Sequence, residues 1–433
     1  MLELKGQLVT LVGYGESNRA MCRFLMERGI YPVVRNPVAV EVPRGIEGVF
    51  GDGYLDGCGG IVFRSPGVRP DKIGCKTYTE AGYALEECRG VKIGVSGSDG
   101  KTTTSTLIYL MLMQGGKNAY LGGNIGTPLI SFCDKVGKDG YLVAELSSFQ
   151  LMDMEPRLDV ACITNITENH LDWHLDMAEY VSAKGRILKN ARRRVLNYDD
   201  EAVFSLGSER DTYFSLRDIR SKGFKEFACV AEGHIYYCEK KLFPVKDICL
   251  KGEFNIKNVL CAVACAYPYV GAEPCGRVAR SFCGVDNRME PMGEINGVSF
   301  VNSAIDSTPS RTIKTLSAFE PKRTVAILGG YDKSLSYECL GGILGELKGV
   351  VLCGENRDKI LPFAKNAKCV NTLGEAVFLA FKLASKGDTV VLSPASASFD
   401  MFKNYKEKAQ RFKQEIKNLR NFTDRNGLND GKN

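Results

Sequence analysis

The chain has 433 residues, 44% of them hydrophobic and 25% charged, a composition typical of globular proteins with roughly two to four domains. No apolar run reaches the roughly 18 residues of a membrane span, and the N-terminus lacks a signal peptide's basic and apolar regions, so we expect a cytoplasmic protein. The net charge of +6 is modest and arises partly from residues 403–425. We therefore expect neither a nucleic-acid nor a membrane partner.

The first predicted strand, residues 7–12, runs into Gly13-Tyr-Gly-Glu-Ser-Asn18 and a helix. This resembles a dinucleotide-binding turn, but Asn18 stands where the third glycine is expected, and no acidic residue follows the second strand near Val34. We therefore do not expect NAD. A tight turn beside an anionic ligand and a cofactor site are equally good interpretations. Ser65-Pro-Gly67 follows strand 61–63 and predicts a second turn at the same edge of the sheet.

The most informative segment is Gly94-Val-Ser-Gly-Ser-Asp-Gly-Lys-Thr-Thr-Thr104. It lies between a β-branched run at 91–95 and an apolar helical segment at 103–112. Amides of a glycine loop at a helix N-terminus bind phosphate, Lys101 can reach the terminal phosphates, and a hydroxyl of Thr102 or Thr103 can hold Mg²⁺. The segment predicts a nucleoside triphosphate site that uses ATP and Mg²⁺.

Two charged residues downstream stand in apolar surroundings. Glu145 ends the predicted strand 141–145, and a carboxylate at that edge, beside a phosphate loop, favours an Mg²⁺ ligand over a helix cap. Lys184 lies in the middle of an apolar helix face that includes Tyr180 and Ile187. Burial favours the neutral amine, which can take up CO₂ to form an anionic carbamate. The alternative is a lysine that extends along its stem to the surface.

Strands and helices alternate along the whole chain, with further strands at 160–164, 324–328 and 389–392 and a helix at 255–266. This pattern predicts parallel α/β layers throughout. The strand at 324–328 runs into Gly329-Gly-Tyr-Asp-Lys333, and the strand at 389–392 runs into Ser393-Pro-Ala-Ser-Ala-Ser398. Both polar turns follow strand ends, where open sheets place ligand groups.

Several motifs occur in the order found in the Mur ligases, and the chain resembles that family over essentially its whole length. The motifs are the phosphate loop, Glu145-Leu-Ser-Ser-Phe-Gln-Leu151, Asn165-Ile-Thr-Glu-Asn-His-Leu-Asp172, Lys184, Asn255-Ile-Lys-Asn258, Gly329–Lys333 and Leu392–Ser398. The resemblance implies an α/β fold with three domains: a Rossmann-like UDP-sugar-binding domain at 1–90, a P-loop ATPase-like domain at 91–284 and a Rossmann-like amino-acid-binding domain at 285–433. It also implies a monomer.

The Glu145–Leu151 and Ser393–Ser398 segments are most similar to the family members that add D-glutamate. The resemblance therefore implies an ATP-dependent amide ligase that joins D-glutamate to UDP-N-acetylmuramoyl-L-alanine through an acyl phosphate. This reaction belongs to peptidoglycan precursor synthesis, and so to cell-wall biogenesis, cell shape and cell division. The implied partners are these small-molecule substrates.

The resemblance assigns functional residues position by position. The implied catalytic residues are Lys101, His170 and Lys184. The implied ATP contacts are Gly97, Ser98, Asp99, Gly100, Lys101, Thr102, Thr103, Asn258 and Arg288. The implied metal ligands are Thr102, Glu145, His170 and Lys184. The implied substrate contacts are Gly15, Ser17, Ser65, Gly67, Asn124, Ser147, Ser307, Lys333, Ser398 and Tyr405.

Tyr405 also belongs to an apolar helical stripe, so core packing is as good an interpretation as a substrate contact. The chain departs from the family pattern at Asn302-Ser-Ala304 and Asn287-Arg288, and no counterpart of the family's uracil-side aspartate stands at Val34-Arg-Asn36. Three alternatives therefore stay open: another Mur-type or polyglutamate-type ligase, a P-loop ATPase that acts as a switch or motor, and a degenerate binding protein that keeps the fold.

Overall fold

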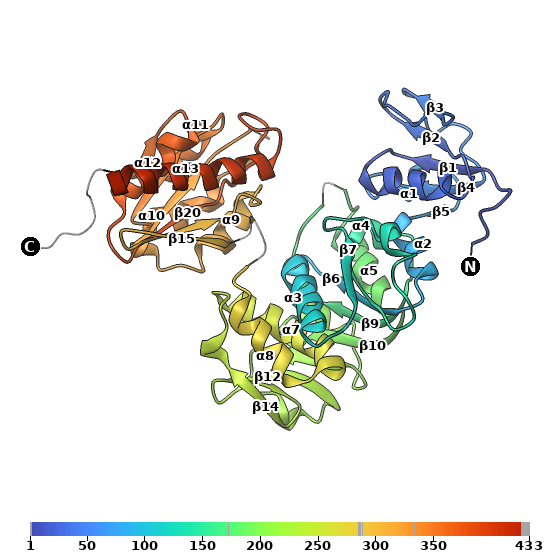
Figure 1. The fold of residues 1–433 in the computed structure, drawn as a ribbon, viewed down its shortest axis with the longest axis horizontal. Helices are drawn as coiled ribbons and strands as arrows, with labels where there is room; N and C mark the ends of the chain where they lie inside the picture. Colours follow the sequence, from blue (N-terminus) through green and yellow to red (C-terminus); the bar gives the residue numbers. More distant parts are fainter. Residues whose placement is uncertain (1, 172, 285–286, 288, 333–334, 426–433) are drawn as a thin grey trace, which may run out of the picture. The chain divides into compact units, whose positions relative to one another are not determined.

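The computed structural model describes residues 2–171, 173–284, 287, 289–332 and 335–425. The chain divides into two compact units (Figure 1). The first comprises Met1–Cys249 and Phe254–Phe282, and the second comprises Leu250–Glu253 and Cys283–Asn433. Among the described residues, no helix is long and apolar enough to cross a membrane.

A five-stranded parallel sheet begins the first unit, with strand order β3-β2-β1-β4-β5. The strands are β1 (Val9–Val12), β2 (Val33–Asn36), β3 (Glu47–Phe50), β4 (Ile61–Arg64) and β5 (Thr77–Tyr78), and the helices are α1 (Glu16–Met26) and α2 (Glu80–Glu87). Because β1 and β4 are parallel neighbours, the two turns that follow them lie at one edge of the sheet.

A nine-stranded sheet forms the rest of the first unit, in the order β14-β13-β12-β11-β10-β9-β6-β8-β7. Its strands are β6 (Val91–Ser96), β7 (Ala119–Gly123), β8 (Tyr141–Glu145), β9 (Arg157–Ile163), β10 (Asn190–Asn197), β11 (Thr212–Ser215), β12 (Glu226–Ala231), β13 (His234–Tyr237) and β14 (Lys240–Pro244). Its helices are α3 (Lys101–Gln114), α4 (Ser148–Leu151), α5 (Met177–Gly185), α6 (Glu201–Phe204), α7 (Glu253–Val270) and α8 (Ala272–Ser281). The central strands β6, β8 and β9 are buried almost throughout, which places the phosphate loop at the end of a rigid element.

The second unit contains a six-stranded sheet in the order β15-β16-β20-β17-β18-β19. Its strands are β15 (Glu290–Ile295), β16 (Val298–Asn302), β17 (Thr324–Leu328), β18 (Gly349–Leu352), β19 (Ala367–Cys369) and β20 (Thr389–Leu392). Its helices are α9 (Pro309–Leu316), α10 (Gly341–Glu346), α11 (Arg357–Ile360), α12 (Leu373–Leu383) and α13 (Tyr405–Arg425). Apolar residues of α12 and α13 cover one face of this sheet, around Phe300 and Phe412.

Short 3₁₀ helices occur at Pro70–Lys72, Leu129–Phe132, Arg186–Leu188, Arg220–Lys222, Val245–Asp247, Pro321–Arg323, Glu338–Leu340 and Leu361–Phe363.

The α/β class with three parallel-rich sheets is confirmed. The expectation of parallel layers throughout is wrong in two places, because β12, β13 and β14 form an antiparallel meander and β15 pairs antiparallel with β16. Such hairpins place consecutive strands side by side without an intervening helix.

Candidate active site

The phosphate loop uses glycine where no other residue fits. Gly97 and Gly100 adopt φ angles of 145° and 78°, which strongly favour glycine. A Cβ at Gly97 would lie 1.9 Å from Thr164 Oγ1, and one at Gly100 would lie 2.2 Å from Asn258 Oδ1. Helix α3 begins at Lys101, directly after Gly100, so its free amides face the loop. The local structure is that of an anion-binding site.

The segment after β9 holds the phosphate loop in place. Asn165 accepts from Ser98 N at its carbonyl oxygen (2.8 Å) and from Asp99 N at Oδ1 (2.9 Å). Thr164 Oγ1 donates to the carbonyl oxygen of Asp99 at 2.5 Å. Neither Thr164 nor Asn165 was predicted as a site residue, although Asn165 opens one of the recognised motifs. An asparagine directly after the predicted strand at 160–164 was the available signal.

Two lysines converge on the same loop. Lys184 is 1% exposed and donates from Nζ to the carbonyl oxygen of Gly97 at 2.7 Å. Lys101 donates to the carbonyl oxygens of Gly97 and Ser98 at 2.9 and 3.0 Å. Burial, followed by the charge of Lys101, holds the pKa of Lys184 well below its ordinary value. Lys184 therefore does not extend to the surface, and its neutral form is favoured.

Tyr180 lies between the phosphate loop and Lys184. It was not among the predicted site residues. Its side chain is fully buried, and its hydroxyl shares a 2.8 Å hydrogen bond with Ser98 Oγ. Lys184 Nζ lies 4.6 Å from the centre of the Tyr180 ring, and the ring of His170 lies 6.5 Å away. In the sequence, Tyr180 stands out only as part of an apolar helix face, because no local pattern shows where a buried hydroxyl finds its partner.

Glu145 has a half-satisfied carboxylate. It ends β8 and is 2% exposed. Oε1 accepts from Asn124 Nδ2 at 2.8 Å, whereas Oε2 is buried and has no hydrogen-bond partner. A buried carboxylate oxygen without a donor is costly, and a hard cation would satisfy it. The two predicted site residues Glu145 and Asn124 are therefore brought together, and Glu145 fits Mg²⁺.

His170 follows in the loop after β9, with a left-handed φ of 58°. Its ring lies 4.9 Å from that of Phe149, and its carbonyl oxygen accepts from the backbone amides of Trp173 and His174 at 3.1 and 2.9 Å. Thr102 and Thr103 stand in the first turn of α3. Asn258 is buried on α7, where Oδ1 accepts from Thr104 Oγ1 at 3.3 Å beside Gly100.

The predicted substrate turns of the first sheet are in contact. Ser65 Oγ donates to the carbonyl oxygen of Gly13 at 2.9 Å, which confirms that the two turns share an edge. Gly15 is the N-cap of α1, and Ser17 lies in its first turn. Asn18, which replaces a glycine of the dinucleotide pattern, donates from Nδ2 to the carbonyl oxygens of Val12, Gly13 and Phe63. It therefore ties the ends of β1 and β4 together.

Two further predicted residues have defined local roles. Ser147 caps α4 in a capping box with Gln150, so its backbone is fixed two residues after Glu145. Gly67 accepts at its carbonyl oxygen from Trp173 Nε1 at 3.1 Å. Trp173 was absent from the predicted site.

In the second unit, Ser398 is 3% exposed, and its Oγ is buried without a hydrogen-bond partner. A hollow of about 480 Å³ is lined by Tyr331 and by Phe399, the residue after Ser398, among others, but Ser398 itself does not line it. Ser307 is half-buried, and so is Tyr405 at the start of α13, whereas Phe412 on the same stripe is fully buried. The predicted residues Arg288 and Lys333 lie outside the described residues.

The departures from the family pattern are bonded to one another. Asn302 Nδ2 donates to Asn287 Oδ1 at 3.1 Å and to Glu290 Oε2 at 3.0 Å. Ser303 Oγ accepts from the backbone amide of Met289 at 3.2 Å. The residues that replace the usual pattern thus form a polar network at the end of β16.

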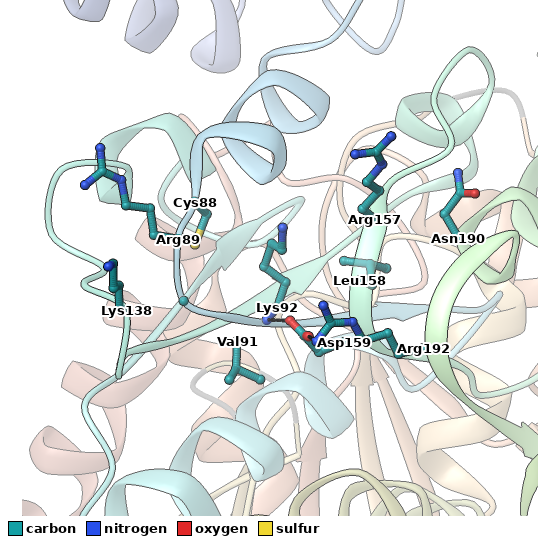
Figure 2. Close-up of a pocket in the computed structure, with 11 residues that line it drawn as sticks. Cys88, Arg89, Val91, Lys92, Lys138, Arg157, Leu158, Asp159, Asn190 and Arg192 are labelled. Atoms are coloured by element: carbon teal, nitrogen blue, oxygen red, sulfur yellow. Dashed lines mark hydrogen bonds and ion pairs between the residues drawn. The ribbon is translucent and has the colours of Figure 1, made fainter. Parts of the chain in front are cut away.

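A cavity of about 570 Å³ lies at the other edge of the central sheet (Figure 2). Val91, Arg157 and Asn190, which line it, are the first residues of β6, β9 and β10, whereas the phosphate loop follows the last residue of β6. Its lining is basic and includes the acid Asp159, which pairs with Arg192 at 3.1 Å. Because open α/β sheets bind ligands at the carboxyl ends of strands, we place the active site at the phosphate-loop edge.

Comparisons with known proteins identify the family of the chain. Residues 95–266 match the Mur ligase middle domain. The chain is 36% identical to the UDP-N-acetylmuramoylalanine--D-glutamate ligase of Acetivibrio thermocellus, over 96% of this chain and 97% of that protein. It is also 36% identical to the enzyme of that name from Clostridium perfringens, over 96% and 98%.

Solved structures show the same fold. A UDP-N-acetylmuramate-alanine ligase from Thermotoga maritima matches with a TM-score of 0.61 and 19% identity, over 95% of this chain and all of that one. A pseudomurein peptide ligase type C from Methanothermus fervidus matches with a TM-score of 0.59 and 17% identity, over 96% of this chain and all of that one. Together with the near full-length relatives, these matches show that the chain belongs to the Mur ligase family.

Proposed function

We propose that this Mur ligase joins D-glutamate to UDP-N-acetylmuramoyl-L-alanine at the expense of ATP, in the synthesis of peptidoglycan precursors. The observation that carries the proposal is that Lys101 and Lys184 both donate to the carbonyl oxygen of Gly97, while the half-satisfied Glu145 pairs with Val95 on the strand that leads into the same loop. The near full-length similarity to ligases named for D-glutamate supports the choice of amino acid.

A carboxylate and an amine do not condense in water, so the carboxylate must be activated. The γ-phosphoryl group of ATP is transferred to the terminal carboxylate of the UDP-sugar, which forms an acyl phosphate and ADP. The amine of D-glutamate then attacks the acyl carbon and expels phosphate. Such transfers depend on alignment and charge neutralisation, which the loop amides and Lys101 supply.

The residues present fit Mg²⁺. Glu145 Oε2 and the Thr102 hydroxyl would hold one ion, and His170 and a carbamate on Lys184 would hold a second. When bound, Mg²⁺ neutralises phosphate charge. Asn124 orients Glu145 by occupying its other carboxylate oxygen at 2.8 Å.

Lys184 is suited to carbamylation by its surroundings. Its amine is buried beside the phosphate loop, and its charged form is disfavoured there. Only a neutral amine can attack CO₂, and the product carries an anionic oxygen in place of a cation. The proposed carbamate turns a buried lysine into a ligand for a hard cation.

The remaining site residues are proposed to divide the substrates among three domains. The turns with Gly15, Ser17, Ser65 and Gly67 in residues 1–90 bind the UDP-sugar, with Asn124 and Ser147 from the central domain at 91–284. Residues 97–103, Asn258 and Arg288 bind ATP. Ser307, Lys333, Ser398 and Tyr405 in residues 285–433 bind D-glutamate, and the unpartnered Ser398 Oγ supports this assignment. We propose a cytoplasmic monomer.

A phosphate-release assay tests the proposal. Purified protein is incubated with ATP, Mg²⁺, UDP-N-acetylmuramoyl-L-alanine and a panel of D- and L-amino acids, with each component omitted in turn. We expect phosphate release only with the complete mixture and D-glutamate. Release without the UDP-sugar or amine would indicate a non-ligase ATPase, and use of a different amino acid would indicate another ligase of the family.

A further inference from the structure

Two arginines flank the Ser65–Gly67 turn, to which the proposed function assigns the UDP-sugar. Arg64 is fully buried and donates to the carbonyl oxygens of Pro66 and Val68 at 3.3 and 3.0 Å. It also pairs with Asp153, which follows α4, at 2.5 Å. Arg64 thus links the Ser65–Gly67 turn to Asp153, in the segment that follows α4.

Arg69, two residues after the turn, links it to α5 and to Trp173. Its guanidinium contacts both carboxylate oxygens of Glu179 on α5, at 2.9 and 3.1 Å, and donates to the carbonyl oxygen of Trp173 at 2.6 Å. The Arg69 and Glu179 side chains are 11% and 17% exposed. A bidentate pair of this kind restricts both distance and angle, which a single contact does not.

Trp173 contacts both the turn and Arg69. Its Nε1 donates to the carbonyl oxygen of Gly67 at 3.1 Å, and the Arg69 guanidinium lies 5.0 Å from the ring centre. The ring also packs against Phe149 at 4.4 Å between centres. The Gly67 carbonyl, within the predicted substrate turn, is therefore held by a rigid aromatic side chain.

The same residues are continuous with the segment that carries His170. The backbone amide of Trp173 donates to the carbonyl oxygen of His170 at 3.1 Å. Glu179 accepts from the backbone amide of Leu175 at 2.9 Å and contacts His174 Nδ1 at 3.2 Å. The Arg69 guanidinium lowers the pKa of Glu179 to about 2, so the pair stays ionised at neutral pH.

We propose that Arg69, Trp173 and Glu179 form a clamp that positions the Ser65–Gly67 turn against the His170 segment and thereby sets the affinity for the UDP-sugar. The three are positioning residues, because they hold the turn and not the reacting atoms. The proposal rests on the assignment of the UDP-sugar to this turn. Loss of the clamp should let the turn move away from the reaction centre while the phosphate loop keeps its own hydrogen bonds.

Steady-state kinetics test the clamp. Arg69→Ala, Glu179→Gln and Trp173→Phe should each raise the KM for UDP-N-acetylmuramoyl-L-alanine, by about tenfold or more for the charged pair. The KM values for ATP and D-glutamate should stay within about twofold, as expected for contacts that serve one substrate. Arg69→Lys should recover only part of the affinity, because an ammonium cannot contact both carboxylate oxygens in the same plane.

A matched control removes a different ion pair. Arg28, after α1, pairs with Asp134 at 2.7 Å, and the two side chains are 36% and 73% exposed. Like Arg69 and Glu179, they link the part of the chain with the first sheet to the part with the second, but they do not contact the substrate turn. Arg28→Ala should leave all three KM values unchanged, since exposed pairs contribute little.

Fluorescence supplies a readout without turnover. Trp173 is the chain's one tryptophan, so its emission reports on the clamp. Titration of wild-type protein with the UDP-sugar, without ATP, should change the emission, and Arg69→Ala should shift the midpoint to higher concentration. If Arg69→Ala does not fold, Arg69→Lys and Glu179→Gln take its place.

The outcomes separate the clamp from the proposed function. Unchanged UDP-sugar KM and titration midpoint in folded Arg69→Ala or Glu179→Gln, with active wild type, would overturn the clamp and leave the ligase function intact. Equal increases in all three KM values would also overturn it, because they would indicate a general structural role. A wild-type protein that binds the UDP-sugar but does not ligate D-glutamate would contradict the proposed function alone.

Discussion

Lys184 Nζ and the carbonyl oxygen of Gly97 are 2.7 Å apart, so a buried lysine of α5 is in direct contact with the phosphate loop. The contact explains how a residue on an apolar helix face becomes part of a polar site. In the proposed function, a carbamate on this amine would replace its positive charge with a negative one beside the phosphate loop.

Lys184→Ala should nearly abolish ligation, because the variant cannot form the carbamate. Short carboxylates such as formate or acetate should restore part of the activity by supplying the missing anionic oxygen. Ligation rates with and without added carboxylate measure the effect, and circular dichroism checks the fold. Lys189→Ala is the matched control, since Lys189 pairs with Glu155 at the surface. Full activity in Lys184→Ala would remove the carbamate from the mechanism.

Lys101→Ala should lower the ligation rate by about 10² to 10³ at saturating ATP, the effect of losing one preorganised electrostatic partner. Lys138→Ala, which removes an exposed cation from the opposite edge of the sheet, should have no such effect. A loss smaller than about threefold in Lys101→Ala would show that the loop lysine does not stabilise the transferring phosphoryl group.

Glu145→Gln should raise the Mg²⁺ concentration needed for half-maximal activity, because the amide keeps the bond to Asn124 but loses the negative charge. Asn124→Ala should have a smaller effect in the same direction, about 10- to 100-fold in metal affinity or activity. Melting curves with and without Mg²⁺ provide a second measurement. We expect Mg²⁺ to stabilise wild type more than Glu145→Gln, and an equal shift in both would argue against Glu145 as a ligand.

Ser398→Ala and Lys333→Ala should raise the KM for D-glutamate, by about 10- to 150-fold for each donor lost from a charged ligand. The KM for ATP should change far less. D-Alanine, L-lysine and D-glutamine should be poor substrates of wild type, because they leave carboxylate-binding donors unsatisfied. Ser317→Ala at the exposed end of α9 is the control. If both variants retained the wild-type KM for D-glutamate, the amino-acid site would lie elsewhere.

Glu80→Gln should stabilise the protein at pH 8 but not at pH 5. Glu80 is 2% exposed, and burial raises its pKa to about 7 although the backbone amide of Ile130 donates to it. The folded state therefore binds more protons than the unfolded state between about pH 4.5 and 7, so Glu80 makes stability fall as pH rises through this window. Above about pH 7, the ionised Glu80 lowers the free energy of unfolding by on the order of 3 kcal/mol.

Urea denaturation at the two pH values measures the Glu80 effect. The amide of glutamine can still accept from the Ile130 amide, so the variant isolates the charge. An identical free energy change at pH 5 and pH 8 would show that Glu80 has an ordinary pKa in the folded protein.

The features that were predicted correctly from the sequence are those set by residues close together along the chain. The glycine loop, its lysine and the helix that follows are contiguous between Gly94 and Gln114, and the helical period alone placed Lys184 among apolar neighbours. Strands at 324–328 and 389–392 were predicted with their observed bounds, because short β-branched runs ended in turn residues. The antiparallel strands were missed, since alternation of elements does not show direction.

The sequence by itself thus determined the α/β class, the phosphate loop and the family, all of which are encoded in local patterns and their order. Only the tertiary structure decided which partner each polar group found. Tyr180 meets Ser98 across 82 positions, Glu145 meets Asn124 across 21, and Arg69 meets Glu179 across 110. Such pairs follow from the packing of distant elements, and the cost of burying a polar group without a partner selects them only once the chain has folded.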